Sequence, residues 1–337
     1  MIQKEIELGP IHTWLPYAMK LKLGMCGDRI VKVGTEFGFL KREIEEKMIG
    51  LGYKEAQLIF GRIDPESSLI LDRLFSEAVE RVTQTEVSDR AHWIREITSI
   101  LSELNSCLKY QAQMADRMGL KFLANIILKH REHLLDLIEL LTGSRYGYYF
   151  LVPGGARYDL TEGFQERVER WVKTFRQDFE RIRSMFLWTH PLQNRLRSLG
   201  KVVDNGDYGF VSESSVETTR YGLVSHVESR LICALTLSES LSSEIEAKMS
   251  ERFTGNFIAP LTEKRGQEEI GIQHETARGT WGLLIKFDSA LKIKKVMTTT
   301  PSQVIRQAIG PALEEESLED VPLILQSLNL SVPEIDR

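Results

Sequence analysis

Cysteine is scarce in this chain, which has three cysteines among its 337 residues. Cys26, Cys107 and Cys233 lie far apart, and no Cys-x-x-Cys pair occurs in the sequence. Iron–sulfur clusters and structural zinc sites built on thiolates need closely spaced cysteines. The sequence therefore provides no such centre of its own. Three isolated cysteines are typical of reduced thiols in the cytoplasm rather than of a disulfide framework.

A basic excess and a long apolar run are also absent. Lysine and arginine total 43 against 48 acidic residues, for a net charge of −5, which argues against a general nucleic-acid binder. No apolar run reaches the roughly 18 residues that a membrane span needs. The first five residues lack the apolar core of a signal peptide. We expect a chain that stays outside the bilayer, although it could dock on a membrane partner.

Long amphipathic segments dominate what is present. Apolar residues at helical spacing predict four long helices, and a stripe of Trp171, Phe175, Phe179 and Ile182 is typical of core packing. Strand-like alternation predicts a β-hairpin within the first 35 residues and a second one near the C-terminus. We therefore predict an α+β fold with a central long-helix bundle and small N-terminal and C-terminal β regions. The helices are expected at 64–83, 91–118, 121–141 and 161–186, and the second hairpin at 281–287 and 291–296.

The chain divides into three predicted regions. Residues 1–60 form an N-terminal α+β region that includes a helix at 38–49, and residues 61–199 form the bundle. Residues 200–337 hold a further helix, the C-terminal β region and a tail that returns to the bundle. Within this last region we expect an irregular stretch at 200–215, a helix at 223–253, and short helices at 304–308 and 321–328.

The segment from Arg62 to Ser68 is central to the functional interpretation. Taken locally it predicts a helix start, because Asp64 is a favourable N-cap and Pro65 fits the first helical position. The same carboxylate could instead face a cavity, and the two roles are compatible. His130 and His133, three residues apart, could share a metal, but the charged neighbours Lys129 and Arg131 favour a solvated face.

Short motifs along nearly the whole chain carry a family resemblance. In their order and spacing they resemble the group 4 nickel–iron hydrogenase large subunits and the related D (quinone-site) subunit of respiratory complex I. The motifs are Gly9-Pro10-Ile11-His12, Arg42-Glu43-Ile44-Glu45, Arg62-Ile63 with Ser68, Arg90-Ala91-His92-Trp93-Ile94-Arg95, Thr142-Gly143-Ser144-Arg145, Pro153-Gly154-Gly155, His274-Glu275-Thr276-Ala277-Arg278-Gly279, and the tail from Ser327 to Arg337.

The departures from this family concern its site residues. The four cysteines that hold the hydrogenase metals fall on Asp64, Ser67, Ser331 and Glu334, so no thiolate remains for nickel. The histidine and tyrosine that the quinone-reducing relatives use fall on Pro16 and Pro65. The resemblance therefore implies a divergent member that is not itself a functional nickel–iron hydrogenase.

The resemblance further implies a role in a complex. It predicts the D-type large subunit of a membrane-bound respiratory oxidoreductase (NADH-quinone oxidoreductase or hydrogenase-related), peripheral to the membrane on its cytoplasmic side. The expected partners are an iron–sulfur small subunit with a [4Fe–4S] cluster, a C-type subunit and a membrane arm. The chain itself would bind no cofactor or metal, with a quinone-like acceptor as an open candidate. A quinone-type reductase with altered cavity residues and a catalytically silent structural subunit stay open as alternatives.

The same resemblance assigns roles to individual residues. His12, Asp64, Arg278 and Glu334 become the candidate catalytic residues, and Arg42, Ser67 and Ser331 the candidate cofactor-facing ones. Arg42 is expected to lie toward the partner's cluster. Two carboxylates left in one buried site would repel, and a guanidinium can bridge them. We therefore predict that Arg278 pairs with Asp64, Glu334 or both.

Overall fold

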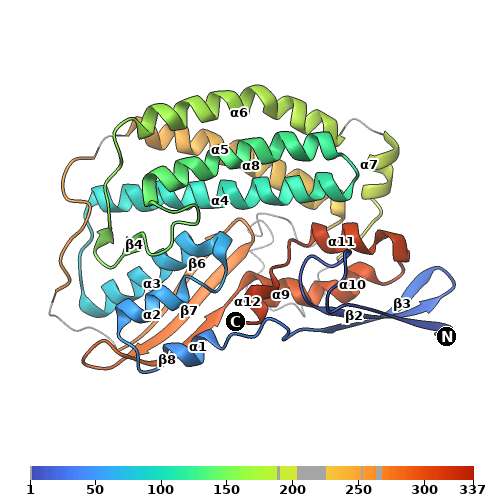
Figure 1. The fold of residues 1–337 in the computed structure, drawn as a ribbon, viewed down its shortest axis with the longest axis horizontal. Coiled ribbons are helices and arrows are strands. Elements are labelled where there is room, and N and C mark those ends of the chain that lie inside the picture. The colour runs from blue at the N-terminus through green and yellow to red at the C-terminus, as the bar shows by residue number, and fades with distance from the viewer. Residues whose placement is uncertain (1, 188–189, 203–224, 252, 263–267) are drawn as a thin grey trace.

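The computed structural model describes residues 2–187, 190–202, 225–251, 253–262 and 268–337. The irregular stretch predicted at 200–215 and the start of the helix predicted at 223–253 lie mostly outside these ranges. Four long helices run side by side along the molecule (Figure 1). They are α4 (Asp89–Arg117), α5 (Lys121–Thr142), α6 (Phe164–Leu187) and α8 (Val227–Ser250).

The bundle core follows from the apolar stripes of these helices. Trp171, Phe175 and Phe179 on α6 are all buried, as the stripe predicts, and the rings of Trp171 and Phe175 stack 5.1 Å apart. The indole nitrogen of Trp171 donates a hydrogen bond to the His130 carbonyl of α5 at 3.0 Å. The predicted helical bundle is therefore confirmed, but its fourth helix is α8 and not the segment predicted at 64–83.

Each small sheet has one strand more than the predicted hairpin. In the N-terminal sheet β1 (Lys4–Leu8), β2 (Lys20–Cys26) and β3 (Arg29–Glu36) pair antiparallel in chain order. In the C-terminal sheet β6 (Glu269–Thr276) joins β7 (Gly279–Phe287) and β8 (Ile293–Thr299) in the same way. Strand β6 was not predicted because Gly271 interrupts a strand with few buried apolar residues. The α+β prediction itself is confirmed.

The prediction of one helix over 38–49 is wrong. Only α1 (Ile44–Met48) forms there. Gly38 and Glu43 have positive φ angles of 104° and 55°, and the amides of Gly38 and Leu40 donate to the Asp336 carboxylate at 2.8 and 2.9 Å. These long-range bonds hold the segment extended. A helix that was not predicted, α2 (Tyr53–Phe60), follows and packs on α3 (Ser68–Thr83).

Short elements complete the fold between the bundle and the sheets (Figure 1). Helix α11 begins at Val321, as predicted, whereas the helix predicted at 304–308 begins earlier, at Pro301, and ends at Ile305. In chain order these elements are η1 (Pro65–Ser67), β4 (Leu151–Val152), β5 (Gly155–Ala156), α7 (His190–Leu196), α9 (Pro301–Ile305), η2 (Arg306–Ala308), α10 (Ile309–Leu313), η3 (Leu318–Asp320), α11 (Val321–Ser327) and α12 (Val332–Ile335).

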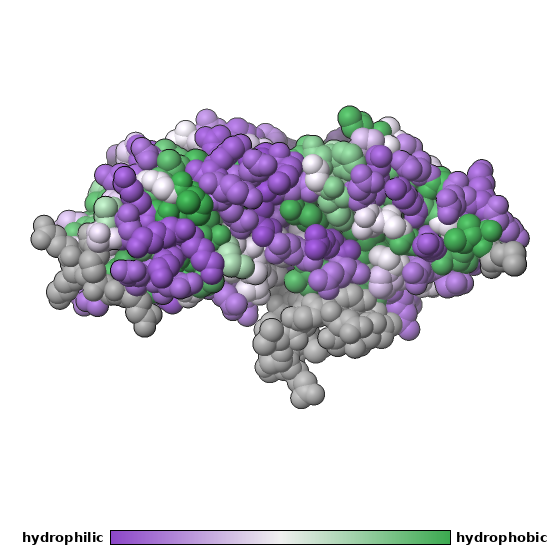
Figure 2. All heavy atoms as spheres, turned by 90° about the horizontal axis from the view of Figure 1, so that it is seen from below, coloured by the Kyte–Doolittle hydropathy of each residue, from purple (hydrophilic) through white to green (hydrophobic). Residues whose placement is uncertain are grey.

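Within the ranges that the structure describes, no helix combines the length and apolar character that crossing a membrane requires. Over the described part of the face seen from below, hydrophilic side chains dominate and hydrophobic ones form separate smaller areas (Figure 2).

Candidate functional site

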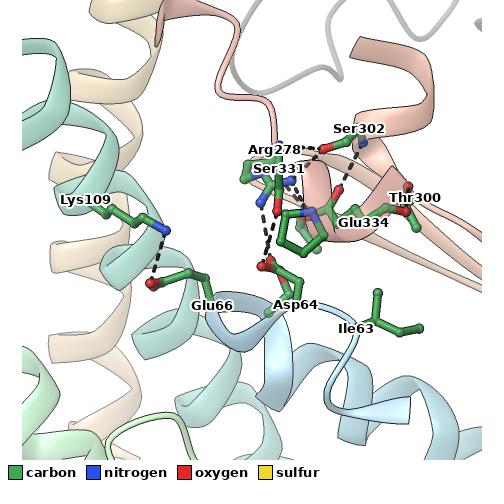
Figure 3. Close-up of polar contacts among 12 residues, drawn as sticks. Ile63, Asp64, Glu66, Lys109, Arg278, Thr300, Ser302, Ser331 and Glu334 are labelled. Atoms are coloured by element: carbon green, nitrogen blue, oxygen red, sulfur yellow. Dashed lines mark hydrogen bonds and ion pairs between the residues drawn. The ribbon is translucent and has the colours of Figure 1, made fainter. Parts of the chain in front are cut away.

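Asp64 lies where the loop after α2 enters η1, and its side chain does not cap a helix. Asp64 and Pro65 take the predicted N-cap and first helical positions of η1, but no backbone N–H of the helix donates to the carboxylate, so the predicted capping bond does not form. The carboxylate instead accepts from the Ser67 hydroxyl at 2.8 Å and from the Ser331 hydroxyl at 3.4 Å. Hydroxyl groups of the loop and the tail thus turn the buried carboxylate away from the helix start and toward the C-terminal tail (Figure 3).

Arg278 lies at the turn of the β6–β7 hairpin. Thr276 stabilises this turn, because its hydroxyl donates to the Gly279 carbonyl at 2.7 Å and accepts from the Arg278 amide at 3.3 Å. Gly279 has a φ of +134°, which residues with a side chain rarely adopt, and a Cβ there would meet Pro301 at 3.3 Å. The turn thereby directs the Arg278 side chain between Asp64 and the tail (Figure 3).

Arg278 bridges both carboxylates, as predicted. Its Nη1 lies 3.4 Å from Asp64 Oδ2, and its Nη2 forms an ion pair with Glu334 Oε1. Nη2 also donates to the Ser302 hydroxyl at 3.1 Å. The Arg278 side chain is 9% exposed, so the pairing takes place almost out of water. We refer to Arg278, Asp64, Glu334, Ser302 and Ser331 as the Arg278 cluster.

Glu334 is fully buried, at 0% exposure. It lies on α12, and its Oε2 accepts from the Ser302 amide at 3.1 Å. Burial, together with repulsion from Asp64, raises the pKa of Glu334 to about 7, although Arg278 and Ser302 oppose the shift. Burial acts to lower the pKa of Arg278, but the two carboxylates outweigh it and raise that pKa.

The four hydrogenase ligand positions do not fit a nickel–iron centre. Asp64, Ser67, Ser331 and Glu334 offer only oxygen atoms, whereas nickel in such centres is held by thiolates. Arg278 already engages both carboxylates. Among the described residues no three His, Cys, Asp or Glu side chains gather in a way that could hold a metal ion.

A second charged cluster, which was not predicted from the sequence, lies beside the first. Glu66 of η1 accepts from Asn105 at 2.7 Å and from Arg131 at 3.2 Å, and it pairs with Lys109 at 3.1 Å. We refer to these four residues as the Glu66 cluster. Lys109 is a lone cation within a buried stretch of α4. An isolated lysine among apolar residues is visible in the sequence and could have marked Lys109 as a site residue.

A small cavity separates the two clusters. Its volume is about 20 Å³, which is room for about one water molecule. Lys109 and Glu66 form one wall, Arg278 and Ser331 another, and Tyr17 reaches it from the loop before β2. The cavity is thus lined by side chains from five separate parts of the chain.

His12 and Arg42, two of the predicted site residues, belong neither to the cavity lining nor to the Arg278 cluster. His12 makes local contacts, since its Nδ1 accepts from the Trp14 amide at 3.2 Å and the two rings meet edge to face. Arg42 donates to the carbonyls of Arg62, Ile63 and Pro333 at 2.6, 2.8 and 2.9 Å. It therefore ties the segment that leads into Asp64 to the tail that carries Glu334.

Replacing Arg42 tests this tie. We expect Arg42→Ala to lower the free energy of unfolding by about 1–2 kcal/mol, because three charge-assisted bonds are lost at a partly exposed site. Chemical denaturation measures the change. Lys41→Ala, at the exposed neighbouring residue, is the control and should change little. Equal stability of the two variants would contradict the role of Arg42 in joining these segments.

His130 does not lie on a solvated face, contrary to the prediction. It is 2% exposed, and its Nε2 lies 3.0 Å from Asp178 Oδ2 of α6. Burial lowers its pKa, which favours the neutral imidazole, while Asp178 opposes this shift. The pair joins α5 to α6, and the neighbouring Arg131 points to Glu66 instead.

The fold and the site define a class of protein: an α+β chain in which a buried ion-pair cluster joins the segment at Asp64 to the C-terminal tail. A family profile described as "Respiratory-chain NADH dehydrogenase, 49 Kd subunit" matches residues 118–211. The D-type subunit of the NADH-quinone oxidoreductase of Desulforamulus reducens is 23% identical over 98% of this chain and 97% of its own length. The chain is therefore a divergent relative of the 49 kDa or D-type subunits.

Further relatives show the breadth of this family. The alpha subunit of the membrane-bound hydrogenase of Pyrococcus furiosus is 26% identical over 59% of this chain and 46% of its own length. For several curated relatives, the matched segment spans about half of the relative. A chain of the membrane-bound sulfane sulfur reductase, an archaeal respiratory membrane complex, shares the fold. It has a TM-score of 0.88, 21% identity, and coverage of 100% of this chain and 99% of that one.

Proposed function

We propose that this chain is the D-type large subunit of a membrane-bound respiratory oxidoreductase complex, in which it forms the acceptor cavity beside an iron–sulfur partner subunit. The observation that carries the proposal is the cavity between the Arg278 and Glu66 clusters. Hydrogen-bond donors line it, and Arg278 joins it to Asp64 and Glu334, two of the positions to which the resemblance assigns the hydrogenase metal ligands.

The chain's own residues would hold this cavity open and polarised without a metal. Arg278 fixes the tail against Asp64, and Glu66 fixes Lys109 on the bundle side. Electrons would arrive from a [4Fe–4S] cluster in the small subunit. A C-type subunit and a membrane arm would attach the assembly to the cytoplasmic side of the membrane.

A catalytically silent structural subunit is the competing proposal. The observation that favours it is the small volume of the cavity, which accepts about one water and no complete substrate within this chain alone. A reductase cavity would then need further walls from partner subunits. A quinone-type reductase with altered cavity residues is the enzyme form that fits such a shared cavity.

Purification of the tagged chain from its native membranes tests the proposal. We expect it to bring along a cysteine-rich small subunit with a reducible [4Fe–4S] signal in electron paramagnetic resonance, together with membrane subunits. Turnover that depends on an added acceptor supports the enzyme, whereas an intact complex without turnover supports the structural role. Recovery of the chain alone would contradict both.

The nickel content of the same preparation is a separate prediction. Because the four ligand positions carry oxygen atoms, we expect no stoichiometric nickel in the purified complex. Elemental analysis measures it, and iron from the partner's cluster is the internal positive control. One nickel per chain would mean that the alignment of Asp64, Ser67, Ser331 and Glu334 with the ligand positions is wrong.

A further inference from the structure

A carboxyl group without a cation is buried between α2, α3 and the α5–β4 loop (residues 143–150). It belongs to Asp72 of α3, which is 1% exposed. Strand β4 lies beside α3 at the end of this loop (Figure 1). The groups that bond to the carboxyl group carry no charge, since they are the amides of Tyr149 and Phe150 and the side chain of Gln57. A carboxylate buried in this way is costly unless it takes up a proton.

Two successive backbone amides of the loop point at Asp72. The Phe150 amide donates to Asp72 Oδ2 at 3.0 Å, and the Tyr149 amide also bonds to the carboxyl group. Tyr149 has a φ of 56°, in the left-handed region that few residues other than glycine adopt. A residue in this region lets consecutive amides converge on one acceptor. Asp72 therefore stabilises an unusual backbone conformation of the loop.

Two oxygen atoms in this contact lack a donor. Asp72 Oδ1 and Gln57 Oε1 are both buried, and neither has a hydrogen-bond partner within the described part of the chain. Oδ1 lies toward α2, because a Cβ built on Gly61 would meet it at 3.3 Å. Gln57 precedes Gly61 by four residues, on the same face of that helix. Buried polar atoms are almost always satisfied in native proteins, so a hydrogen is missing between α2 and α3.

The Gln57 amide cannot supply this hydrogen. Its Nε2 donates to the Leu151 carbonyl at 2.7 Å and to the Ser76 hydroxyl at 3.2 Å. An amide nitrogen has two hydrogens, and both are engaged by these bonds. Turning the amide over would place Oε1 against the Leu151 carbonyl, where two acceptors would repel. Gln57 therefore presents an acceptor that needs a donor.

The charged side chains near Asp72 on α3 and α4 are engaged elsewhere. Arg73 pairs with Glu77 at 2.8 Å, and Arg95 donates to Glu80 at 2.9 Å. Both cations are thus already compensated by other carboxylates. They do not neutralise a charge on Asp72.

The titratable groups on the side of α2 and the loop are tyrosines and one arginine. Burial raises the pKa of Tyr149, with contributions from Tyr53 and Asp72, whereas Arg157 opposes the shift. The Arg157 guanidinium lies over the Tyr149 ring, 5.5 Å from its centroid. For Asp72 itself, burial raises the pKa well above its usual value, although the two amides and Gln57 act in the opposite direction.

We propose that Asp72 is a neutral carboxylic acid in the folded chain, and that it donates its hydrogen from Oδ1 to Gln57 Oε1. One proton then satisfies both oxygen atoms, while Oδ2 stays free to accept from the loop amides. The bond joins α3 to α2 at the point where the α5–β4 loop is held. Loss of the proton leaves a charge without a donor at Oδ1 and releases the loop.

The loop that this bond holds covers the segment leading to the Arg278 cluster. The Tyr146 carbonyl accepts from the Ser68 hydroxyl. The Arg62 guanidinium lies over the Tyr148 ring, 4.2 Å from its centroid. Asp72 thus acts as a pH-sensitive catch on the chain next to Asp64, apart from the titration of the cluster itself.

Asp72→Asn imitates the neutral acid, because an amide has an acceptor for the loop and a donor for Gln57 but cannot ionise. At about pH 6, well above the usual pKa of an aspartate, we expect the denaturation midpoint of the full chain to stay at the native value or rise. Asp72→Ala, which leaves the loop amides unbonded, should lower it. Asp28→Asn, at an exposed turn, is the matched control. Equal losses in Asp72→Asn and Asp72→Ala would overturn the proposal.

Infrared spectroscopy detects the proton directly. With ¹³C in the aspartate carboxyl groups, the native chain at the same pH should show the carbonyl stretch of a protonated acid, shifted by the label and absent from Asp72→Asn. Because glutamate is not labelled, Glu334 cannot produce this shift. A native spectrum with ionised aspartates only would mean that Asp72 is charged and that a water supplies the missing hydrogen, which also overturns the proposal.

Hydrogen exchange tests the release of the loop. The stabilisation from this proton is complete below pH 3.8 and is lost as the pH rises through the raised pKa of Asp72. The amides of residues 146–152 should therefore lose protection at a lower pH in the native chain than in Asp72→Asn, where no proton can leave. Identical profiles in the two proteins would show that Asp72 does not control the loop.

Discussion

Arg278→Ala is expected to lower the free energy of unfolding by about 3–5 kcal/mol, which is the usual cost of removing one partner from a buried ion pair. The loss is large because Asp64 and Glu334, both nearly inaccessible to water, would face each other without the guanidinium. One of the two carboxyl groups would then have to take up a proton. Denaturant titration at pH 7 measures the change.

The Arg278→Ala experiment has an internal check. Adding Asp64→Asn and Glu334→Gln removes the stranded charges, so the triple variant should recover part of the lost stability. Arg306→Ala, at an exposed arginine nearby, is the matched control and should stay within about 0.5 kcal/mol of the native protein. Additive losses in the triple variant would show that the three side chains do not act as one cluster.

Glu334 should make the stability depend on pH. Its pKa is raised from 4.5 to about 7 in the folded chain, so between these values the folded state holds a proton that the unfolded state has lost. This stabilisation is complete below pH 4.5 and is lost as the pH rises through 7. A shift of this size corresponds to about 3 kcal/mol across the window.

Comparison of the native protein with Glu334→Gln isolates this contribution. The glutamine variant has no proton to lose at this position, so its stability should fall less steeply between about pH 5 and 8. Glu319→Gln, at an exposed residue of the same region, should keep the native slope. Parallel curves for the native protein and Glu334→Gln would show that the pKa of Glu334 is not raised in the folded state.

The Arg278 cluster could be predicted from the sequence because its members lie in motifs that follow the family order. Because two carboxylates in one buried site would repel, Asp64 and Glu334 together predicted a contact with the Arg278 guanidinium. The local interpretation of Asp64 gave its N-cap position correctly but not the partners of its side chain. The hydroxyls of Ser67 and Ser331 and the guanidinium of Arg278 bind the carboxylate, and none of these contacts is visible from the residues next to Asp64.

The Glu66 cluster could not be predicted from any single segment. Glu66, Lys109 and Arg131 come from η1, α4 and α5, and they meet only because the bundle packs beside η1. Strand β6 escaped prediction for a related reason. It depends on pairing with β7 along its whole length, from Glu269 opposite Lys286 to Thr276 opposite Gly279, rather than on its own apolar pattern.

The span of the Arg278 cluster along the chain also sets the order in which the molecule can fold. The contacts of Asp64 with Arg278 and Ser331 join positions 214 and 267 residues apart, whereas α4 and α5 are consecutive helices. Contacts between residues so far apart in the sequence have the largest entropic cost of loop closure and form slowly. The helix pair α4 and α5 can therefore pack first, and the Asp64 carboxylate stays hydrated until the distant hairpin and tail pack against it.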